Sequence, residues 1–385
     1  MFTYNAPTKL FIDYDLDKLG EVIKSYGFKN VLFLYGGGSI KKGSLYNKVV
    51  NSLKSYDINF IEVSGVEPNP KVSFVREVLA NNYEFDMILA VGGGSVIDTA
   101  KSIAVSYKCG IDPWKFNSHE VKPEKSMPIG VILTLSAAGS EMSSSCVITN
   151  LELQIKQGFN SEVNRPLFAI MNAELTYSVN KYQTACGITD IMAHVFERYF
   201  TNTKDVETTD RLCEAVLLAM INEAPKVIAN PNDYQARANI MWAGMVAHNN
   251  IVGVGRSQDW NSHGIEHELS ALYDCAHGAG LSVIMPNWMK FVMNHDIMRF
   301  CQMATRIWGC KMDFSNPEKT AMEGIEAFRT FLTSIGMPAT ITELGGKESD
   351  IPTLVKTFGL PEGGKTGGFV QLSSDDIATI YKMAL

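Results

Sequence analysis

The first 180 residues repeat one local pattern, in which a short apolar run is followed by a glycine-rich turn and then by a helical stretch. Units of this kind stack into a parallel sheet, because each helix returns the chain to the edge where the next strand begins. We expect strands at Asn30–Tyr35, Asn59–Val63, Asp86–Val91, Met127–Leu133 and Phe168–Met171. The first half is therefore predicted to be an α/β domain with a parallel sheet.

The second half has a different pattern. After about Lys181 the glycine-rich turns become rare, and residues 185–200, 208–224 and 234–249 show the 3.6-residue periodicity of helices. A chain of 385 residues exceeds the usual size of a single core, so two domains are expected. We place the α/β domain at residues 1–180 and an all-α domain at residues 181–385.

Composition and charge exclude several classes of partner. The net charge is -7 and no run of five basic residues occurs, so a nucleic-acid partner is not expected. The N-terminus has no secretory pattern and no apolar run approaches membrane-spanning length, so we expect no membrane partner. The seven cysteines include no CxxC pair, which indicates reduced thiols and a cytoplasmic protein.

The turn Gly92-Gly93-Gly94-Ser95 lies between an apolar run and a helical stretch that contains Asp98. Glycines allow the backbone to approach an anion closely, and the first turn of a helix offers unpaired amide groups. The spacing is neither GxGxxG nor GxxxxGKS, and a tight turn with no ligand explains it equally well. The turn is a candidate phosphate site.

Two further turns are candidates for contact with a nucleotide. Thr134 and Ser136 follow another expected strand and supply hydroxyl groups, although Ser140 and Glu141 nearby are equally suited to capping a helix. The turn from Gly36 to Lys42 carries two lysines and no acid. If this turn faces the adenosine ribose, it would tolerate a 2′-phosphate, so NADP(H) is favoured over NAD(H), unless both lysines merely lie on a solvated face.

A cluster of histidines indicates a metal site. Asp190 and His194 are four residues apart, so on a helix they share one face. His263 lies in a second helical stretch, and His277 follows it after a turn. One aspartate and three histidines suit Fe²⁺, Zn²⁺, Co²⁺, Mn²⁺ or Ni²⁺, while a single buried histidine is more often structural. The clustering favours the metal.

Two other histidines need a separate interpretation. His267 lies one helical turn beyond His263 and is suited to be a fifth ligand, a group that supports the ligands or a proton relay; we favour the relay. His248 lacks a comparable setting and is interpreted as a structural residue near the site.

Taken in order, these motifs resemble those of the iron-containing (group III) alcohol dehydrogenases, whose fold is like that of dehydroquinate synthase. The resemblance spans nearly the whole chain. The motifs that carry it are Gly92–Lys101, Gly139–Glu141, Gly187–His194 and His263–His267 with His277-Gly278. The turn at Tyr35–Lys41 and the pair Asp259-Trp260 resemble most the branch of butanol dehydrogenases and broad-range aldehyde reductases. Ala138 departs from the usual threonine of this family.

The resemblance implies a role for each matching residue. It assigns a divalent metal, Fe²⁺ or Zn²⁺, to Asp190, His194, His263 and His277, and places His267 near the substrate. It places the adenosine ribose near Gly37, Gly38 and Ser39, the pyrophosphate on Gly93, Gly94 and Ser95, and the nicotinamide near Asp98, with further cofactor contacts from Thr134, Ser136 and Lys156. It also implies a homodimer.

The expected reaction interconverts a small primary alcohol and its aldehyde, with hydride exchanged at C4 of the nicotinamide and the metal polarising the oxygen. A lyase or synthase acting on a phosphorylated substrate would need a basic cluster beside the metal, and only Arg198, Arg256 and Lys290 are candidates. A metal hydrolase is also compatible with the histidine cluster, and failure to bind a dinucleotide would favour it. A non-catalytic binding protein is disfavoured, because two kinds of site occur together in the chain.

Overall fold

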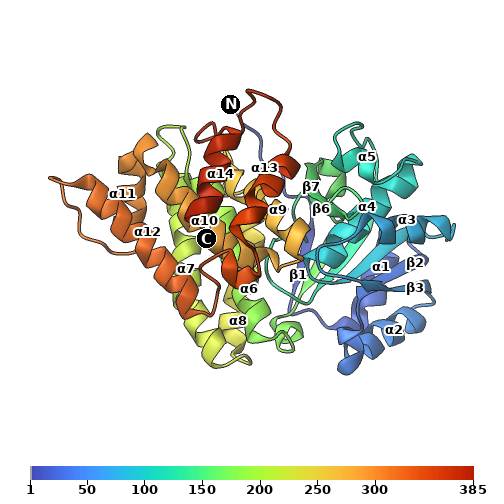
Figure 1. Cartoon of the computed structure of the whole chain (residues 1–385). Helices are drawn as coiled ribbons and strands as arrows, with labels where there is room; N and C mark the ends of the chain where they lie inside the picture. The colour runs from blue at the N-terminus through green and yellow to red at the C-terminus, as the bar shows by residue number, and fades with distance from the viewer. Residues whose placement is uncertain (1) are drawn as a thin grey trace. The chain divides into compact units, whose positions relative to one another are not determined.

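The computed structural model describes residues 2–385, which divide into two compact units (Figure 1). One unit comprises Asn5–Val179, and the other comprises Asn180–Leu385 together with the N-terminal residues through Tyr4. Within residues 2–385, no helix combines the length and the apolar character needed to cross a lipid bilayer.

The first unit is built on a parallel sheet of six strands in the order β1-β8-β5-β4-β2-β3. All five expected strands are present. The sequence did not indicate β1, a short strand at the edge of the sheet that no glycine-rich turn announces. The strands are β1 (Lys9–Ile12), β2 (Asn30–Gly36), β3 (Asn59–Val66), β4 (Met87–Gly92), β5 (Ile129–Leu133) and β8 (Phe168–Met171).

Helices cover both faces of this sheet (Figure 1). Helices α1 (Leu19–Ser25) and α2 (Leu45–Ser55) pack against alternate residues of β2, among them Phe33 and Tyr35. The chain runs across the sheet in one direction from β1 to β3 and returns from β3 to β5. Because such crossovers are right-handed, α3 (Val72–Ala80) and α4 (Gly94–Cys109) belong to the opposite face.

This order makes β2 and β4 neighbours whose following helices lie on opposite faces. Ligands of open α/β sheets bind at such a switch point, outside the carboxyl ends of the two strands. The turns that follow these strands are the glycine-rich turns at residues 36–39 and 92–95. The topology therefore places both glycine-rich turns where ligands of such sheets bind.

A small antiparallel hairpin, which the sequence did not indicate, is attached to the sheet. It consists of β6 (Ser145–Asn150) and β7 (Ile155–Asn160), and the short helix α5 (Trp114–Asn117) packs on it. The fully buried Lys101 on α4 holds the start of the hairpin by donating to Ser140 Oγ at 2.7 Å and to the carbonyl oxygen of Ser145 at 2.7 Å.

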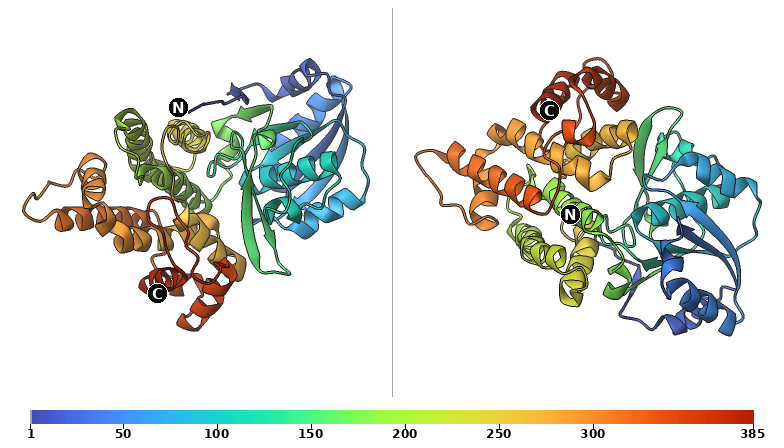
Figure 2. Two further views of the ribbon diagram at one scale, coloured as in Figure 1. Left: turned by 90° about the horizontal axis from the view of Figure 1, so that it is seen from above. Right: turned by 60° about the horizontal axis from the view of Figure 1, so that its bottom comes forward.

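The second unit is helical, as expected (Figure 2). Helix α6 is buried along almost its whole length, because the other long helices surround it. A side chain at Gly278 would collide with the carbonyl oxygen of Cys186, so this glycine lets the start of α10 approach α6 closely. The helices are α6 (Lys181–Tyr199), α7 (Glu207–Ala229), α8 (Tyr234–His248), α9 (Asn261–Tyr273), α10 (His277–Val292), α11 (Ile297–Arg306), α12 (Pro317–Ser334), α13 (Ile351–Phe358) and α14 (Ser374–Met383).

Glu141 makes the stability of the α/β unit depend on pH. Burial raises the pKa of this carboxyl group from 4.5 to about 7. Its contribution to the free energy of unfolding is therefore complete below pH 4.5 and is lost as the pH rises through 7. We expect Glu141→Gln to exceed the wild type in stability at pH 8, by on the order of 3 kcal/mol, and to lose this advantage near pH 4.5.

Urea unfolding of both proteins at pH 4.5, 6 and 8 measures the effect. The matched control is Glu124→Gln, which removes an exposed carboxylate and should leave the difference from the wild type independent of pH. An equal difference for Glu141→Gln at the three pH values would contradict the prediction.

Candidate functional site

Three helices bring the expected metal ligands together in the helical unit. Asp190 and His194 lie on α6, His263 lies in the first turn of α9, and His277 begins α10. The Nε2 atoms of His263 and His277 lie 3.9 and 3.7 Å from Oδ1 of Asp190. The possible ligand atoms of Asp190, His263 and His277 all lie within 4.8 Å of one another, which is a spacing that one ion spans.

Each of the three histidines is held by an acceptor at Nδ1. His263 Nδ1 lies 2.8 Å from Glu197 Oε1, and His277 Nδ1 contacts Glu266 Oε2. His194 Nδ1 lies 2.8 Å from the carbonyl oxygen of Asp190. Because these oxygens accept, each ring carries a proton on Nδ1, and Nε2 is the nitrogen that can bind an ion once it is deprotonated. This is the arrangement of histidines that ligate metals through Nε2.

Two of the possible ligand atoms are buried without a hydrogen bond of good geometry. His263 Nε2 has no partner, and Asp190 Oδ1 has only the contact with His194 Nδ1, 2.9 Å away. An unsatisfied buried polar atom is costly, and an ion between these two atoms would satisfy both. The residues present therefore fit a divalent metal.

The electrostatics of the cluster favour positive charge. Burial alone would raise the pKa of Asp190, but the neighbouring His194 and His263 hold it well below its usual range. Burial would lower the pKa of His263, but the nearby acids Asp190 and Glu197 outweigh burial and raise it to about 9. Without an ion the cluster binds a proton, so a metal must displace it.

The rings form a row of five imidazoles in the order His248, His194, His263, His277 and His267. The distances between successive ring centroids are 4.2, 4.5, 5.3 and 5.4 Å. His194 thus lies against the ring of His263. It does not belong to the group formed by Asp190, His263 and His277, whose possible ligand atoms all lie within 4.8 Å of one another. His267 lies beside His277 at one end, and His248 lies beside His194 at the other.

Sequence reasoning missed two carboxylates of this site. Glu197 and Glu266 are almost completely buried and hold His263 and His277 at Nδ1. Glu197 also accepts from the backbone N–H groups of Trp260 at 2.7 Å and of His263 at 2.9 Å. A signal was present, because each glutamate follows a histidine by three residues, His194 and His263 respectively. That spacing places each glutamate on the same face of the helix as the histidine that precedes it.

At the nucleotide end, α4 begins at Gly94 directly after β4, and Gly93 is its N-cap. The first amides of a helix have no partner within it, so those of Gly94 and Ser95 are available to an anion. The backbone N–H of Thr134 is bonded to the carbonyl of Gly92, and Ser136 Oγ is buried with no partner. An unsatisfied hydroxyl beside the turn is what a ligand of this site would satisfy.

Two expected cofactor residues have partners within the α/β unit. Asp98 accepts from Ser140 Oγ at 2.5 Å and from the backbone N–H of Val147 at 3.0 Å. Burial raises its pKa, although Lys101, 3.8 Å away, opposes this shift. Lys156 lies on β7 and donates to Asn69 Oδ1 at 3.0 Å. Asp98 therefore holds the hairpin in place as well as lying near the glycine-rich turn.

The turn after β2 has an acidic neighbour that the sequence did not indicate, and this weakens the case for NADP(H). In this turn Gly37 and Gly38 have open space around them, and Ser39 begins a short 3₁₀ helix, Ser39–Lys42. Glu62 on β3 accepts from Lys41 Nζ at 2.8 Å. This hydrogen bond, joined by one from Tyr35, lowers the pKa of Glu62 to about 2. One of the two lysines thus already has an anionic partner.

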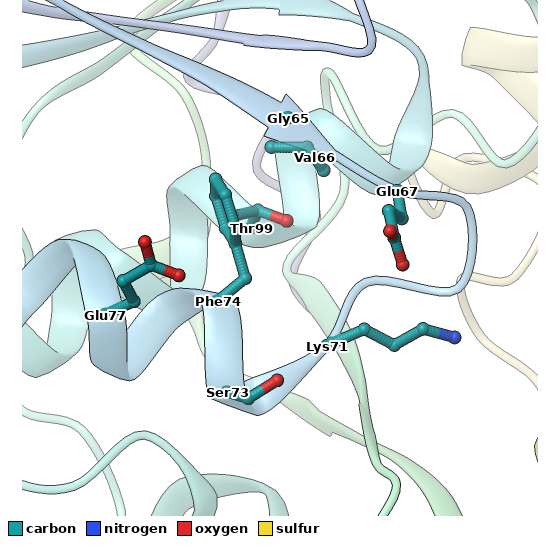
Figure 3. A pocket seen from close by; sticks show the side chains of 8 residues that line it. All are labelled: Gly65, Val66, Glu67, Lys71, Ser73, Phe74, Glu77 and Thr99. Carbon is teal, nitrogen blue, oxygen red and sulfur yellow. The ribbon is translucent and has the colours of Figure 1, made fainter.

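A cavity of about 200 Å³ lies at the carboxyl end of β3, between α3 and Thr99 of α4 (Figure 3). It contains none of the residues expected to bind the metal or the cofactor. Its lining residues are Gly65, Val66, Glu67, Lys71, Ser73, Phe74, Glu77 and Thr99. The chemistry of the chain is therefore better inferred from its polar clusters than from this cavity.

Comparison with known proteins identifies the family of both units. Residues 7–173 match the model of the iron-containing alcohol dehydrogenases, and residues 184–385 match the model of the C-terminal part of that family. NADH-dependent butanol dehydrogenase A of Clostridium acetobutylicum is 38% identical over 386 residues, which cover 99% of this chain and 98% of that protein.

Two further similarities are as extensive. NADPH-dependent aldehyde reductase YqhD of Escherichia coli is 35% identical over 361 residues, with 92% of each chain covered. The crystal structure of NADH-dependent butanol dehydrogenase A from Thermotoga maritima superposes with a TM-score of 0.95 at 37% identity, covering 100% of this chain and 98% of that one.

The hydrogen bonds of Glu197 predict how metal binding depends on this residue. We expect Glu197→Gln to weaken zinc binding by about 10- to 100-fold, because the amide no longer fixes the proton of His263 on Nδ1. Titration of the metal-stripped protein with zinc in competition with a chromophoric chelator measures the affinity. Glu268→Gln is the control, since Glu268 is equally buried on α9. Equal affinities for both variants would contradict the role of Glu197.

Proposed function

The chain belongs to the iron-containing alcohol dehydrogenase family and is an NAD(P)H-linked oxidoreductase of alcohols and aldehydes, and we propose that it interconverts small primary alcohols such as butanol with their aldehydes. The names of its relatives support this substrate class, since they include butanol dehydrogenases and an aldehyde reductase. The observation that carries the proposal is the pair of unsatisfied buried atoms, Asp190 Oδ1 and His263 Nε2.

We propose that Asp190, His194, His263 and His277 hold one divalent ion, with Fe²⁺ as the first choice and Zn²⁺ as the second. Imidazole nitrogen and carboxylate oxygen are borderline donors that suit both ions, and the family is named for iron. When bound, the ion supplies a Lewis acid for the substrate oxygen.

For the dinucleotide, the proposal uses the switch point of the sheet. The pyrophosphate binds at Gly93, Gly94 and Ser95, where the first amides of α4 are available. The adenosine ribose binds at Gly37, Gly38 and Ser39 at the end of β2, and Asp98 lies near the nicotinamide. Thr134, Ser136 and Lys156 make further contacts with the cofactor, and the unsatisfied hydroxyl of Ser136 supports this assignment.

In the direction of reduction, a bound reduced nicotinamide would supply the hydride that the carbonyl carbon of the aldehyde accepts. His267 would supply the proton to the oxygen, which receives the π electron pair of the carbonyl, directly or through a ribose hydroxyl or a water. His267 lies beside His277, and Glu266, His267 and His277 are also close enough together to hold an ion. We assign the relay to His267 because it lies on the far side of His277 from Asp190 in the row of rings.

We also propose that the enzyme is a cytoplasmic homodimer. All seven cysteines are free thiols, which suits a reducing compartment. The edge strand β1 is short and carries the half-exposed Ile12, and such an edge is a common place for a second chain to attach.

Absorbance at 340 nm tests the proposed function. Protein reconstituted with Fe²⁺ or Zn²⁺ is given NADH or NADPH and a series of short aldehydes. We expect oxidation of the cofactor with butanal, and its loss in protein stripped of metal. Absence of activity with either cofactor across the series would refute the proposal.

His267 is expected to affect turnover and not the metal. If it supplies the proton, His267→Ala lowers kcat for aldehyde reduction by about 100-fold or more. Metal analysis of the purified variant should give the wild-type content, whereas His263→Ala should lose the ion. Loss of the metal from His267→Ala would make His267 a ligand instead.

Glu62 gives a prediction about the choice of cofactor. Because Glu62 already neutralises Lys41, we propose that NAD(H) is used more efficiently than NADP(H). Glu62→Gln frees the lysine for a 2′-phosphate, so the ratio of kcat/KM for NADPH to that for NADH should rise about tenfold. The double variant Glu62→Gln/Lys41→Ala should lose this gain. A ratio unchanged by Glu62→Gln would contradict the proposed role of the pair.

A further inference from the structure

Arg198 is a buried cation beside the metal centre with no carboxylate partner. It lies one helical turn beyond His194 on α6 and is only 3% exposed. Its Nη1 donates to the carbonyl oxygen of His194 at 2.6 Å and its Nη2 contacts Nδ1 of His248 at 2.9 Å. Its guanidinium carbon lies 4.6 Å from the centroid of a Trp260 ring. Within residues 2–385, the buried Arg256 pairs with Asp210, and no such ion pair occurs at Arg198.

His248 does not add a second charge. Arginine has only donors, so Nδ1 of His248 must accept, and the ring carries its proton on Nε2. This is the opposite tautomer to that of His194, His263 and His277. His248 is therefore a neutral side chain that helps to fix Arg198 in place.

Acidic side chains outnumber basic ones around the proposed ion. Glu197 accepts from the backbone N–H of His263 and contacts its Nδ1, and Glu266 accepts from Ser270 and contacts Nδ1 of His277. Asp190, a proposed ligand, is the third acid. Arg198 is the buried cation that lies beside this set.

Two other buried acids, Asp259 and Glu268, lie in this unit. Asp259 is bonded to the backbone N–H groups of Gly368 and Phe369 rather than to a ligand histidine. Burial, and after it Glu197, raises the pKa of Asp259 to about 7, and burial does the same for Glu268. A cation beside these acids matters because an uncompensated charge in a buried site is expensive.

We propose that Arg198 is a positioning residue whose charge compensates the excess negative charge of the metal centre and so favours the negative charge that develops on the substrate oxygen during aldehyde reduction. This role rests on the proposed function. Arg198 acts through the electrostatic field and not by contact with the substrate. Its burial makes the effect large, because solvent screens a buried charge weakly.

A charge role and a scaffold role predict opposite effects on metal affinity. If Arg198 only supports His194 and Trp260, its loss disorders the ligands and weakens binding of the ion. If its charge is what matters, its loss removes a repulsion between two cations and strengthens binding, while the reaction slows. A purely structural role cannot produce tighter metal binding together with slower turnover.

Zinc affinity of the full-length, metal-stripped protein therefore tests the proposal, again by competition with a chromophoric chelator. For Arg198→Gln we expect the dissociation constant for zinc to fall at least tenfold and kcat for butanal reduction to fall at least tenfold. Arg198→Lys retains the charge and should restore the zinc affinity to within about threefold of the wild type. Arg211→Gln, the same change at an exposed arginine of α7, should leave zinc affinity as it is.

Weaker or unchanged zinc binding by Arg198→Gln would overturn the proposal. If Arg198→Gln does not fold, Arg198→Lys decides the test alone. A loss of zinc affinity greater than tenfold in Arg198→Lys would overturn the proposal, because this variant keeps the positive charge. Asp190→Asn separates this failure from that of the proposed function. If Asp190→Asn leaves the zinc affinity unchanged, the metal centre itself is refuted. If Asp190→Asn loses zinc and Arg198→Gln binds zinc more weakly than the wild type, only the role of Arg198 is refuted.

Discussion

The carboxylate of Glu197 is the interaction on which the centre of the helical unit depends. It orients His263 through Nδ1 and accepts the backbone N–H groups of Trp260 and His263, so it replaces the missing side-chain cap of α9. Trp260, the N-cap residue, has a φ of 75°, a conformation that bulky residues rarely adopt. The negative charge also lies at the positive end of the α9 dipole. One buried side chain thus joins α6 to α9, begins a helix and orients a proposed ligand.

Local patterns were sufficient to predict most of the fold. The strands from β2 to β5 and β8 are apolar over their whole length because both faces of the sheet are covered, and the sequence shows them directly. The edge strand β1 and the hairpin β6–β7 have no such signal, since they are short or mix polar and apolar residues. The elements that the sequence did not indicate, β1, β6 and β7, are therefore those whose residues are not buried on both faces.

The candidate site divides in the same way. The spacing of Asp190 and His194 on one helix face is a local property, and it was sufficient to identify this pair. The contact of Glu62 with Lys41 joins residues 21 positions apart, and that of Arg198 with His248 joins residues 50 positions apart. No local pattern specifies such contacts, so the sequence indicated a turn without an acid and a structural His248. Pairing across the sheet places an acid beside the turn, and packing between helices gives the structural His248 its partner, Arg198.

The arrangement of α6 explains why the partners of the metal centre are so closely coupled. Asp190, His194 and Arg198 follow one another at intervals of four residues, so a single helix face carries two proposed ligands and the cation that balances them. Glu197, one residue before Arg198, reaches the next helix instead. Because α6 is buried almost throughout, these side chains have little freedom to rearrange, and each needs an internal partner. A helix that supplies both ligands and counter-charges fixes their relative positions by its own geometry, without depending on the loops around it.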